Sequence, residues 1–196
     1  MRRTVVLFVR APLLGRGKRR LAREIGDLAA LRFERSMIAL LLRRLAKDGR
    51  WRLRIAVTPD QANYRARHWC IGVETVNQDK GDLGIRMHRA LANCSPGPAV
   101  LVGADIPALD ARHVAEAFRL LGRHDLVFGP AEDGGFWLVG ARHPRRLPPL
   151  FKRVRWSTPH ALADTLAGLP GRRTVGFAAR LEDVDDGEAY LSLIHI

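Results

Sequence analysis

Short apolar runs rich in β-branched residues alternate along this chain with segments whose apolar residues recur at helical spacing. Residues 4–9, 53–57 and 99–103 are runs of the first kind, which is typical of strands buried on both faces of a parallel sheet. Residues 21–47 repeat Leu, Ile, Phe and Met with the period of an amphipathic helix. The alternation predicts an α/β fold in three layers, a mainly parallel sheet with helices on both faces.

The rest of the chain continues this alternation. We expect further strands at residues 73–76, 126–128, 136–139 and 174–177, and helices at residues 59–69, 85–92, 110–121 and 159–167. Asp110 is placed to cap one of these helices. Because no linker or internal repeat divides the chain, we predict one domain over residues 1–190.

Composition limits the class of protein. No apolar run approaches the roughly 20 residues of a membrane-spanning helix, and two cysteines, Cys70 and Cys94, are too few for a disulfide framework. These features favour the cytoplasm and predict no membrane span. Residues 1–54 hold sixteen of the 33 Lys and Arg but only four of the 20 Asp and Glu. Residues 10–30 contain no aromatic side chain between these cations, so nucleic acid is not the expected partner.

The loop after the first strand combines cations with residues that bend the backbone. These residues are Arg10, Pro12, Gly15, Arg16, Gly17, Lys18, Arg19 and Arg20. Glycines let the backbone approach a phosphate, and the following helix and the cations favour an anion. The loop matches neither the P-loop nor the dinucleotide-binding pattern. Judged by this loop alone, the sequence fits an anion site and an exposed basic turn equally well.

Carboxylates stand where strands are predicted to end. Asp105 follows the strand at residues 99–103, where ligands bind in open sheets and where an Asp can hold Mg²⁺ or Mn²⁺; a turn Asp is the alternative. Asp133 lies in a Gly-rich bend between two strands, and Asp-Gly is also a common hairpin turn. In an extended segment Asp183 and Asp185 would share one face, suited to a metal or a cationic group. A solvated acidic loop is the alternative there.

Six segments, taken together and in order, resemble one known family. They are Arg10-Ala-Pro-Leu-Leu-Gly with Lys18 and Arg20-Leu-Ala, Gly81-Asp-Leu-Gly-Ile-Arg-Met87, Gly103-Ala-Asp-Ile-Pro-Ala-Leu109, Gly129-Pro-Ala-Glu-Asp-Gly-Gly-Phe-Trp-Leu-Val-Gly140, Trp156-Ser-Thr158 and Asp183-Val-Asp185. The resemblance is to the bacterial glycosyltransferase-like proteins with a GT-A-type fold, the radical-SAM/selenodomain-associated transferases. It spans about residues 4–190.

This resemblance implies a nucleotide-diphospho-sugar transferase fold and assigns roles within it. The nucleotide-binding residues it implies are Arg10, Pro12, Gly15, Lys18, Arg20, Gly81, Asp82 and Gly84. Asp105 and Asp185 match the ligands of the divalent metal, Mg²⁺ or Mn²⁺. Asp133 matches a position beside the acceptor, so Asp105 and Asp133 are the expected catalytic residues. The final segment, residues 191–196, does not resemble the family's closing helix and is predicted to be a non-native tail.

Two reactions remain open at this point. The first is glycosyl transfer from a nucleotide diphosphate-sugar to a small acceptor, assisted by the metal. The alternative is a nucleotidyltransferase, which joins a nucleoside monophosphate to a phosphorylated acceptor and releases pyrophosphate. The basic first loop suits the triphosphate of the second reaction as well as the diphosphate of the first.

Overall fold

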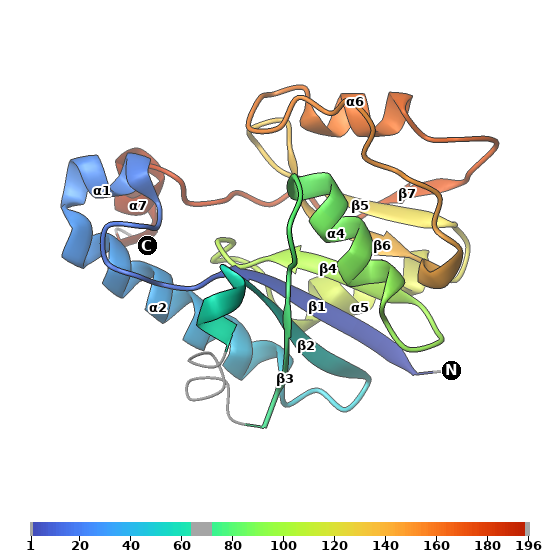
Figure 1. Cartoon of the computed structure of the whole chain (residues 1–196), viewed down its shortest axis with the longest axis horizontal. Helices are drawn as coiled ribbons and strands as arrows, with labels where there is room; N and C mark the ends of the chain where they lie inside the picture. The colour runs from blue at the N-terminus through green and yellow to red at the C-terminus, as the bar shows by residue number, and fades with distance from the viewer. Residues whose placement is uncertain (1, 64–71, 195–196) are drawn as a thin grey trace.

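The computed structural model describes residues 2–63 and 72–194. A seven-stranded sheet in the order β3-β2-β1-β4-β6-β5-β7 forms its centre (Figure 1). The strands are β1 (Arg3–Arg10), β2 (Trp51–Thr58), β3 (Glu74–Asn77), β4 (Ala99–Gly103), β5 (Leu126–Pro130), β6 (Phe136–Ala141) and β7 (Val175–Phe177). All pairs are parallel except those of β6, which runs antiparallel to both β4 and β5. The expected mainly parallel sheet is therefore confirmed.

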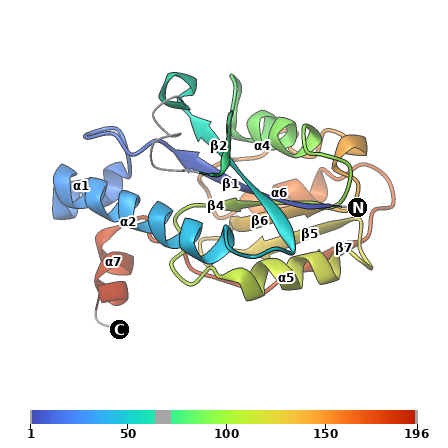
Figure 2. The same cartoon turned by 90° about the horizontal axis from the view of Figure 1, so that it is seen from below.

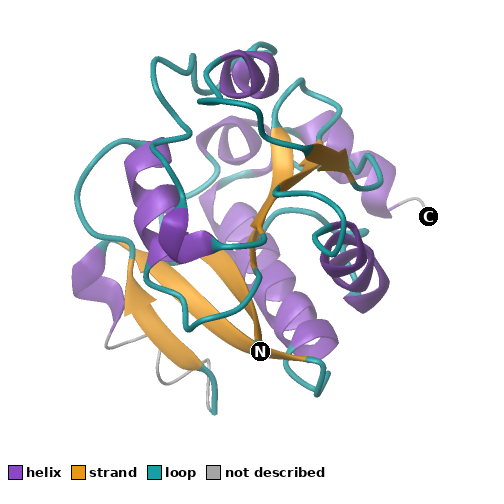
Figure 3. Ribbon diagram, turned by 90° about the vertical axis from the view of Figure 1, so that its right-hand side faces the viewer, coloured by secondary structure: helices purple, strands orange, loops and turns teal. Residues whose placement is uncertain are grey.

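Helices cover both faces of this sheet, as Figures 2 and 3 show. They are α1 (Arg19–Ile25), α2 (Asp27–Leu45), α4 (Leu83–Ala92), α5 (Ala111–Leu120), α6 (Ala161–Ala167) and α7 (Gly187–Ile194), with two short 3-10 helices, η1 (Asp60–Ala62) and η2 (Pro144–Arg146). Buried residues of α2 and α5 pack on one face, and those of α4 pack on the other together with residues 147–156. The three-layer architecture is thereby confirmed. Among the described helices, none is both long enough and apolar enough to cross a bilayer.

The core consists of the apolar runs that predicted the strands. Val5 and Leu7 of β1 lie in register with Val100 and Val102 of β4 in one layer of the core. Val6 and Leu101, between them, are buried in the other layer. Because alternate side chains of a strand point to opposite faces, the two central strands supply apolar side chains to both layers. Their carboxyl ends, at Arg10 and Gly103, therefore reach the same edge of the sheet.

The helix expected over residues 21–47 was predicted wrongly as one element. Gly26 adopts φ 85° and ψ 152°, which interrupts the helix and separates α1 from α2. Only glycine enters this backbone region at little cost, so the break occurs at the one residue of the segment without a Cβ. The break changes the direction of the chain between α1 and α2, and α1 lies beside α7, joined to β1 by a long loop (Figure 1).

Most other boundaries agree with the sequence to within a few residues. The helix expected at residues 59–69 begins as η1, and residues 64–71, with Trp69 and Cys70, lie outside the described part of the chain. The helix capped by Asp110 is confirmed, since this carboxylate accepts the N–H groups of Arg112 and His113. The expected edge strand at residues 174–177 is β7, which pairs with β5.

The C-terminal segment crosses the molecule to reach α1 and α2 (Figure 1). The ring of Tyr190 on α7 meets that of Phe33 on α2 edge to face, with centroids 5.5 Å apart. The N–H of Gly187 donates to Glu24 Oε1 on α1 at 3.2 Å. These contacts fix the end of an extended segment, residues 178–186, that passes the carboxyl end of β4. The helix α7 continues into residues 191–194, whose predicted non-native origin stays a prediction.

Candidate functional site

A cleft of about 830 Å³ opens at the carboxyl ends of β1 and β4. Its polar lining comes from segments that are distant in sequence: residues 10–20, Glu34 of α2, Asp105 after β4, Asp133 in the β5–β6 turn, residues 157–158 and Asp185 in the C-terminal segment. In open α/β sheets, ligands bind outside the carboxyl ends of the strands, in the crevice where the strand order reverses its direction. Here β1 lies between β2 and β4, which places the crevice at the predicted loops.

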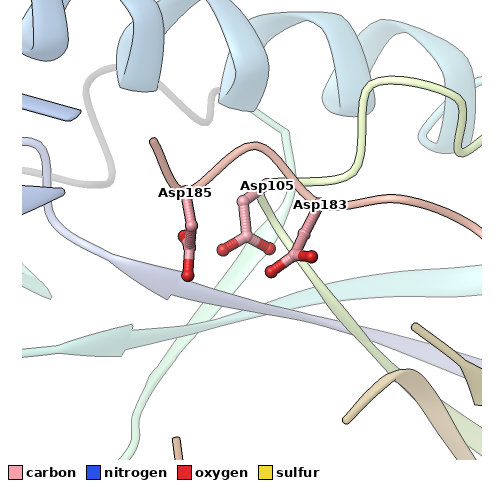
Figure 4. Close-up of side chains that lie close together, drawn as sticks. All are labelled: Asp105, Asp183 and Asp185. Atoms are coloured by element: carbon pink, nitrogen blue, oxygen red, sulfur yellow. The ribbon is translucent and has the colours of Figure 1, made fainter. Parts of the chain in front are cut away.

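Three carboxylates gather in this cleft: Asp105, Asp183 and Asp185 each offer an oxygen within 4.8 Å of the others (Figure 4). Asp105 directly follows the buried strand β4. In the extended C-terminal segment the alternation of side chains buries Val184 and places both Asp183 and Asp185 toward Asp105. The N–H of Val184 donates to the carbonyl of Asp105 at 3.1 Å, which holds the two segments together.

Asp183 is partly buried beside the other two carboxylates. Its burial, followed by the charges of Asp185, Asp105 and Asp133, raises the pKa of Asp183 from its ordinary value of 3.8 to about 6. The neighbouring negative charges disfavour the ionised form of Asp183. The sequence placed Asp183 on the same face as Asp185, but only Asp105 and Asp185 were selected as metal ligands; the geometry adds Asp183 to this set.

Lys18 lies against the carboxylates. Its Nζ is 2.7 Å from Asp185 Oδ1 and 3.3 Å from Asp105 Oδ2, and its side chain is only 11% exposed. Burial alone would lower the pKa of Lys18, but the two carboxylates outweigh burial and raise that pKa. Lys18 is therefore a counter-ion of the acidic cluster in this state, besides being a candidate partner for a phosphate.

Glu34 of α2 holds the backbone of this lysine, which sequence reasoning missed. Its Oε1 accepts the N–H of Lys18 at 3.0 Å, and a Cβ at position 17 would overlap the same carboxylate. Gly17 is thus required for the close approach of Glu34 to the loop. Burial raises the pKa of Glu34, against the opposing effect of the Lys18 hydrogen bond and charge. No local pattern reveals the role of Glu34, because it depends on a contact sixteen residues away.

The other cations of the first loop also line the cleft: Arg10, Arg16, Arg19 and Arg20. Pro12 and Gly15, expected at the nucleotide, do not line it. Pro12 lies in a second, apolar cavity against α2, and Gly15 adopts φ 70°, which turns the loop. The loop therefore presents its guanidinium groups to the cleft, while Pro12 and Gly15 set its path.

Gly81, Asp82 and Gly84 are likewise absent from the cleft lining among the described residues. Asp82 caps α4, its Oδ1 accepting the N–H of Ile85 at 2.8 Å. Gly81 adopts φ 128°, and a Cβ on Gly84 would collide with Phe151. These three residues shape the start of α4, which brings Leu83 to the cleft.

Asp133 lines the same cleft from the β5–β6 turn. Its Oδ1 accepts the N–H of Gly135 at 2.8 Å. Gly134 has φ 82° and lies so close to Pro159 that a Cβ there would overlap its backbone. The N–H of Leu162 also donates to the carbonyl of Gly134 at 3.2 Å. The Asp-Gly sequence therefore forms a hairpin turn, and the turn is fixed with Asp133 at the cleft.

This chain is similar to one protein family and to several solved structures. Residues 41–158 match the family described as "Uncharacterized protein conserved in bacteria (DUF2064)". The chain belongs to this family. A comparison with curated proteins found no match. The family match covers β4, Asp105, the β5–β6 turn and Asp133.

Solved structures extend the comparison over nearly the whole fold. A candidate nucleotide-diphospho-sugar transferase from Desulfovibrio desulfuricans G20 is 28% identical, with a TM-score of 0.86 over 95% of this chain and 84% of the other. CMP:2-keto-3-deoxy-manno-octonic acid synthetase, solved with CTP, is 13% identical, with a TM-score of 0.60 over 99% and 97% of the two chains.

A third similar structure is glucosyl-3-phosphoglycerate synthase from Mycobacterium tuberculosis, in complex with Mn²⁺, UDP and glucosyl-3-phosphoglycerate. It is 14% identical, with a TM-score of 0.57 over 97% of this chain and 75% of the other. The two more distant structures share the fold, which is therefore that of nucleotide-diphospho-sugar transferases and nucleotidyltransferases.

The acidic cluster suits a divalent cation by its chemistry. Asp105, Asp183 and Asp185 form an all-oxygen donor set, which Mg²⁺ and Mn²⁺ prefer. A bound cation would offset both causes of the raised pKa of Asp183, which are its burial first and then the neighbouring carboxylates. Lys18 contacts two of the same carboxylates, so a cation and the ammonium group would share these oxygens.

Proposed function

We propose that this chain transfers a glycosyl group from a nucleotide diphosphate-sugar to a hydroxyl of a small acceptor. The observation that carries the proposal is the arrangement of one cleft. Its first-loop wall carries five cations, a cluster of carboxylates lies at its centre, and Asp133 stands in the β5–β6 turn. An anionic diphosphate, a divalent cation and an acceptor hydroxyl each find a suitable group there.

In this proposal Asp105, Asp183 and Asp185 hold Mg²⁺ or Mn²⁺, which when bound neutralises charge on the leaving diphosphate. Lys18 and the arginines of the first loop bind the phosphates and stabilise the same negative charge as it develops. The oxygen of the acceptor forms a bond to the anomeric carbon while the bond from that carbon to the phosphate oxygen breaks. The electron pair leaves with the nucleoside diphosphate, and the acceptor proton passes to a carboxylate oxygen of Asp133.

A thermal-shift titration tests the proposal with the full chain, with and without Mn²⁺, against nucleotide-sugars, nucleoside diphosphates and nucleoside triphosphates. A ligand at about 100 times its dissociation constant stabilises the folded state by about 2.7 kcal/mol. We expect cation-dependent stabilisation by a nucleotide-sugar, lost in Asp105→Asn. The Asp133→Asn variant is the matched control, since it should keep this stabilisation and lose transfer. A chain that responds to no nucleotide contradicts the proposal.

The second candidate is nucleotidyl transfer to a phosphorylated acceptor. The four arginines that line the cleft beside Lys18 favour it, because they suit the higher charge of a triphosphate. The CTP-bound structural relative has the same fold. In the titration this candidate predicts stabilisation by a triphosphate and none by any nucleotide-sugar.

Several sequence-based expectations remain proposals. We propose that residues 1–190 act as one transferase domain in the cytoplasm, with residues 191–196 as a non-native tail. The expected place among the radical-SAM/selenodomain-associated transferases rests on the motifs alone. The small-molecule substrates are a nucleotide-sugar or a nucleoside triphosphate together with the acceptor.

A further inference from the structure

The charges that line the cleft are segregated. All five cations of the lining come from residues 10–20, on the first-loop wall. The facing wall comes from β6, α4 and residues 157–159, and among the described residues it contributes no Lys, Arg or His. Its polar groups are Asp133, Ser157 and Thr158. One wall is therefore suited to a highly charged anion and the other to an uncharged molecule.

Arginines that lie near the facing wall make other contacts. Arg86 of α4 lies over the ring of Phe8 and donates to Gln78 Oε1 at 2.8 Å. Both the Nε and Nη2 of Arg155 donate to the carboxylate of Asp164, at 2.9 and 2.8 Å. Arg180 pairs with Glu132 at 3.8 Å. None of these arginines lines the cleft. A phosphate bound at this wall would face the carboxylate of Asp133 without a cation, and an unpaired charge removed from water is costly.

The facing wall also has a rigid apolar part. Phe136 lies in the cleft, and its ring stacks on Phe151 at 6.2 Å with an interplanar angle of 13°. Trp156 packs edge-on behind it at 6.2 Å. Leu83 and Phe8, both partly exposed, line the cleft as well. The ring of Phe136 is held in place by its neighbours, so this surface is formed before any ligand arrives.

Ser157 stands beside this surface in an unusual conformation. Its φ is 58°, in the left-handed region that a residue with a Cβ rarely adopts. Its exposed hydroxyl makes no hydrogen bond to any described residue, whereas Thr158 Oγ1 donates to the carbonyl of Arg155 and accepts the N–H of His160. Such conformations persist where the surroundings impose them, and they cluster at binding sites.

From this wall we infer that the acceptor is an uncharged hydroxyl compound with an apolar face, an aryl or alkyl alcohol, and that Ser157 binds it by a hydrogen bond. The apolar face lies against Phe136, and the reacting hydroxyl lies near Asp133. The inference rests on the proposed glycosyl transfer, because it assigns the acceptor half of the same cleft. It also separates the two candidate reactions proposed above, since the second was proposed with a phosphorylated acceptor.

A matched pair of probes tests the inference: 4-(hydroxymethyl)phenol and 4-(hydroxymethyl)phenyl phosphate, which share the benzylic hydroxyl and differ in the phosphate. Ligand-observed NMR titrations on the full chain, with saturating UDP and Mn²⁺ so that the nucleotide occupies the first-loop cations, give both affinities. We expect the uncharged probe to bind at least about tenfold more tightly, because the phosphate finds no cation at this wall. Equal or tighter binding of the phosphate probe overturns the inference, as does binding of neither probe.

Ser157→Gly separates a binding role from a structural one. Glycine adopts φ 58° without strain, so the variant should melt no lower than the parent while binding the uncharged probe several-fold more weakly. Arg153→Gly is the matched control, because Arg153 has φ 56° and does not line the cleft. It should leave the affinity for the probe unchanged. Unchanged affinity in Ser157→Gly removes Ser157 from the acceptor site.

The proposed glycosyl transfer and the assignment of the acceptor wall can each be wrong without the other. If the uncharged probe binds as expected but no nucleotide binds with Mn²⁺, the proposed glycosyl transfer is wrong and the assignment of this wall stands. If UDP binds with Mn²⁺ but the phosphate probe is preferred, the proposed cleft stands and the acceptor class is wrong.

Discussion

Replacing Asp183 by Asn should stabilise the cation-free protein at neutral and alkaline pH. The pKa of Asp183 is raised from 3.8 to about 6, by burial first and then by Asp185, Asp105 and Asp133. The folded chain therefore binds this proton more tightly than the unfolded chain. Consequently the free energy of unfolding falls as the pH rises through the interval from 3.8 to about 6, and it stays at the lower value above that interval.

The size of the effect follows from this shift. A difference of about two pH units corresponds to about 3 kcal/mol, and screening by water at a partly exposed group reduces it to about 1–2 kcal/mol. For a chain of this length the melting temperature should rise by about 2–4 °C per kcal/mol. The gain should be complete at pH 8 and absent below pH 4.

Melting curves of parent and Asp183→Asn across pH 4 to 8, in the presence of a chelator, measure this gain. Glu182→Gln is the matched control: it removes one carboxylate from the neighbouring, exposed position of the same segment and should change little. With Mn²⁺ present the order should reverse, because the parent binds the cation through a carboxylate that the variant lacks. A variant that melts no higher than the parent at pH 8, or higher by the same amount at pH 4, would refute the reasoning.

Three other substitutions test separate parts of the site. Lys18→Met should weaken nucleotide binding by about 1–3 kcal/mol, the range for charge-assisted hydrogen bonds. Titration calorimetry measures this loss. An unchanged nucleotide affinity together with a lower melting temperature would leave Lys18 as a structural counter-ion. Gly134→Ala should destabilise the fold by at least about 1–3 kcal/mol, since it combines φ 82° with overlap on Pro159. Chemical denaturation measures this loss, and a loss below about 0.5 kcal/mol would contradict the packing. Glu34→Ala should lower stability by about 1–3 kcal/mol by leaving the Lys18 N–H without its acceptor, whereas Glu34→Gln should retain most of it.

The layers of the fold could be predicted because strands buried in a parallel sheet have continuous runs of apolar residues in the sequence. The run at residues 99–103 predicted β4, and its end predicted the position of Asp105 at the edge of the sheet. The antiparallel pairing of β6 with β5 was indicated only by the short Asp-Gly link between them, which is too short for a parallel crossover. The position of β6 between β4 and β5 had no local signal. The break at Gly26 was hidden by helical periodicity on both sides of it.

The site residues that lie in a recognisable local sequence pattern could be predicted. The residues that act through contacts with distant parts of the chain could not. Asp105 follows the apolar run of a predicted strand, and Asp185 lies in a segment expected to be extended. The structure brings the two carboxylates together. Glu34 gave no signal, because its partner is a backbone N–H in another element. Gly81 and Gly84 matched a family motif, yet their contacts serve the start of α4 rather than the cleft.

The extended segment that carries Asp183 and Asp185 begins beside β5, where the N–H of Ala178 donates to the carbonyl of Phe128 and the carbonyl of Ala179 accepts the Nε1–H of Trp137. Nearer to the two carboxylates it makes two backbone hydrogen bonds to the described residues beside the sheet. The N–H of Leu181 donates to the carbonyl of Pro130, and that of Val184 to the carbonyl of Asp105. A divalent cation held jointly by Asp105 and by these two carboxylates would act as a removable cross-link between the centre of the sheet and the C-terminal helix α7. Its binding would then set how often the segment opens, so amide exchange and protease cleavage near Val184 would report cation occupancy even when no nucleotide is bound.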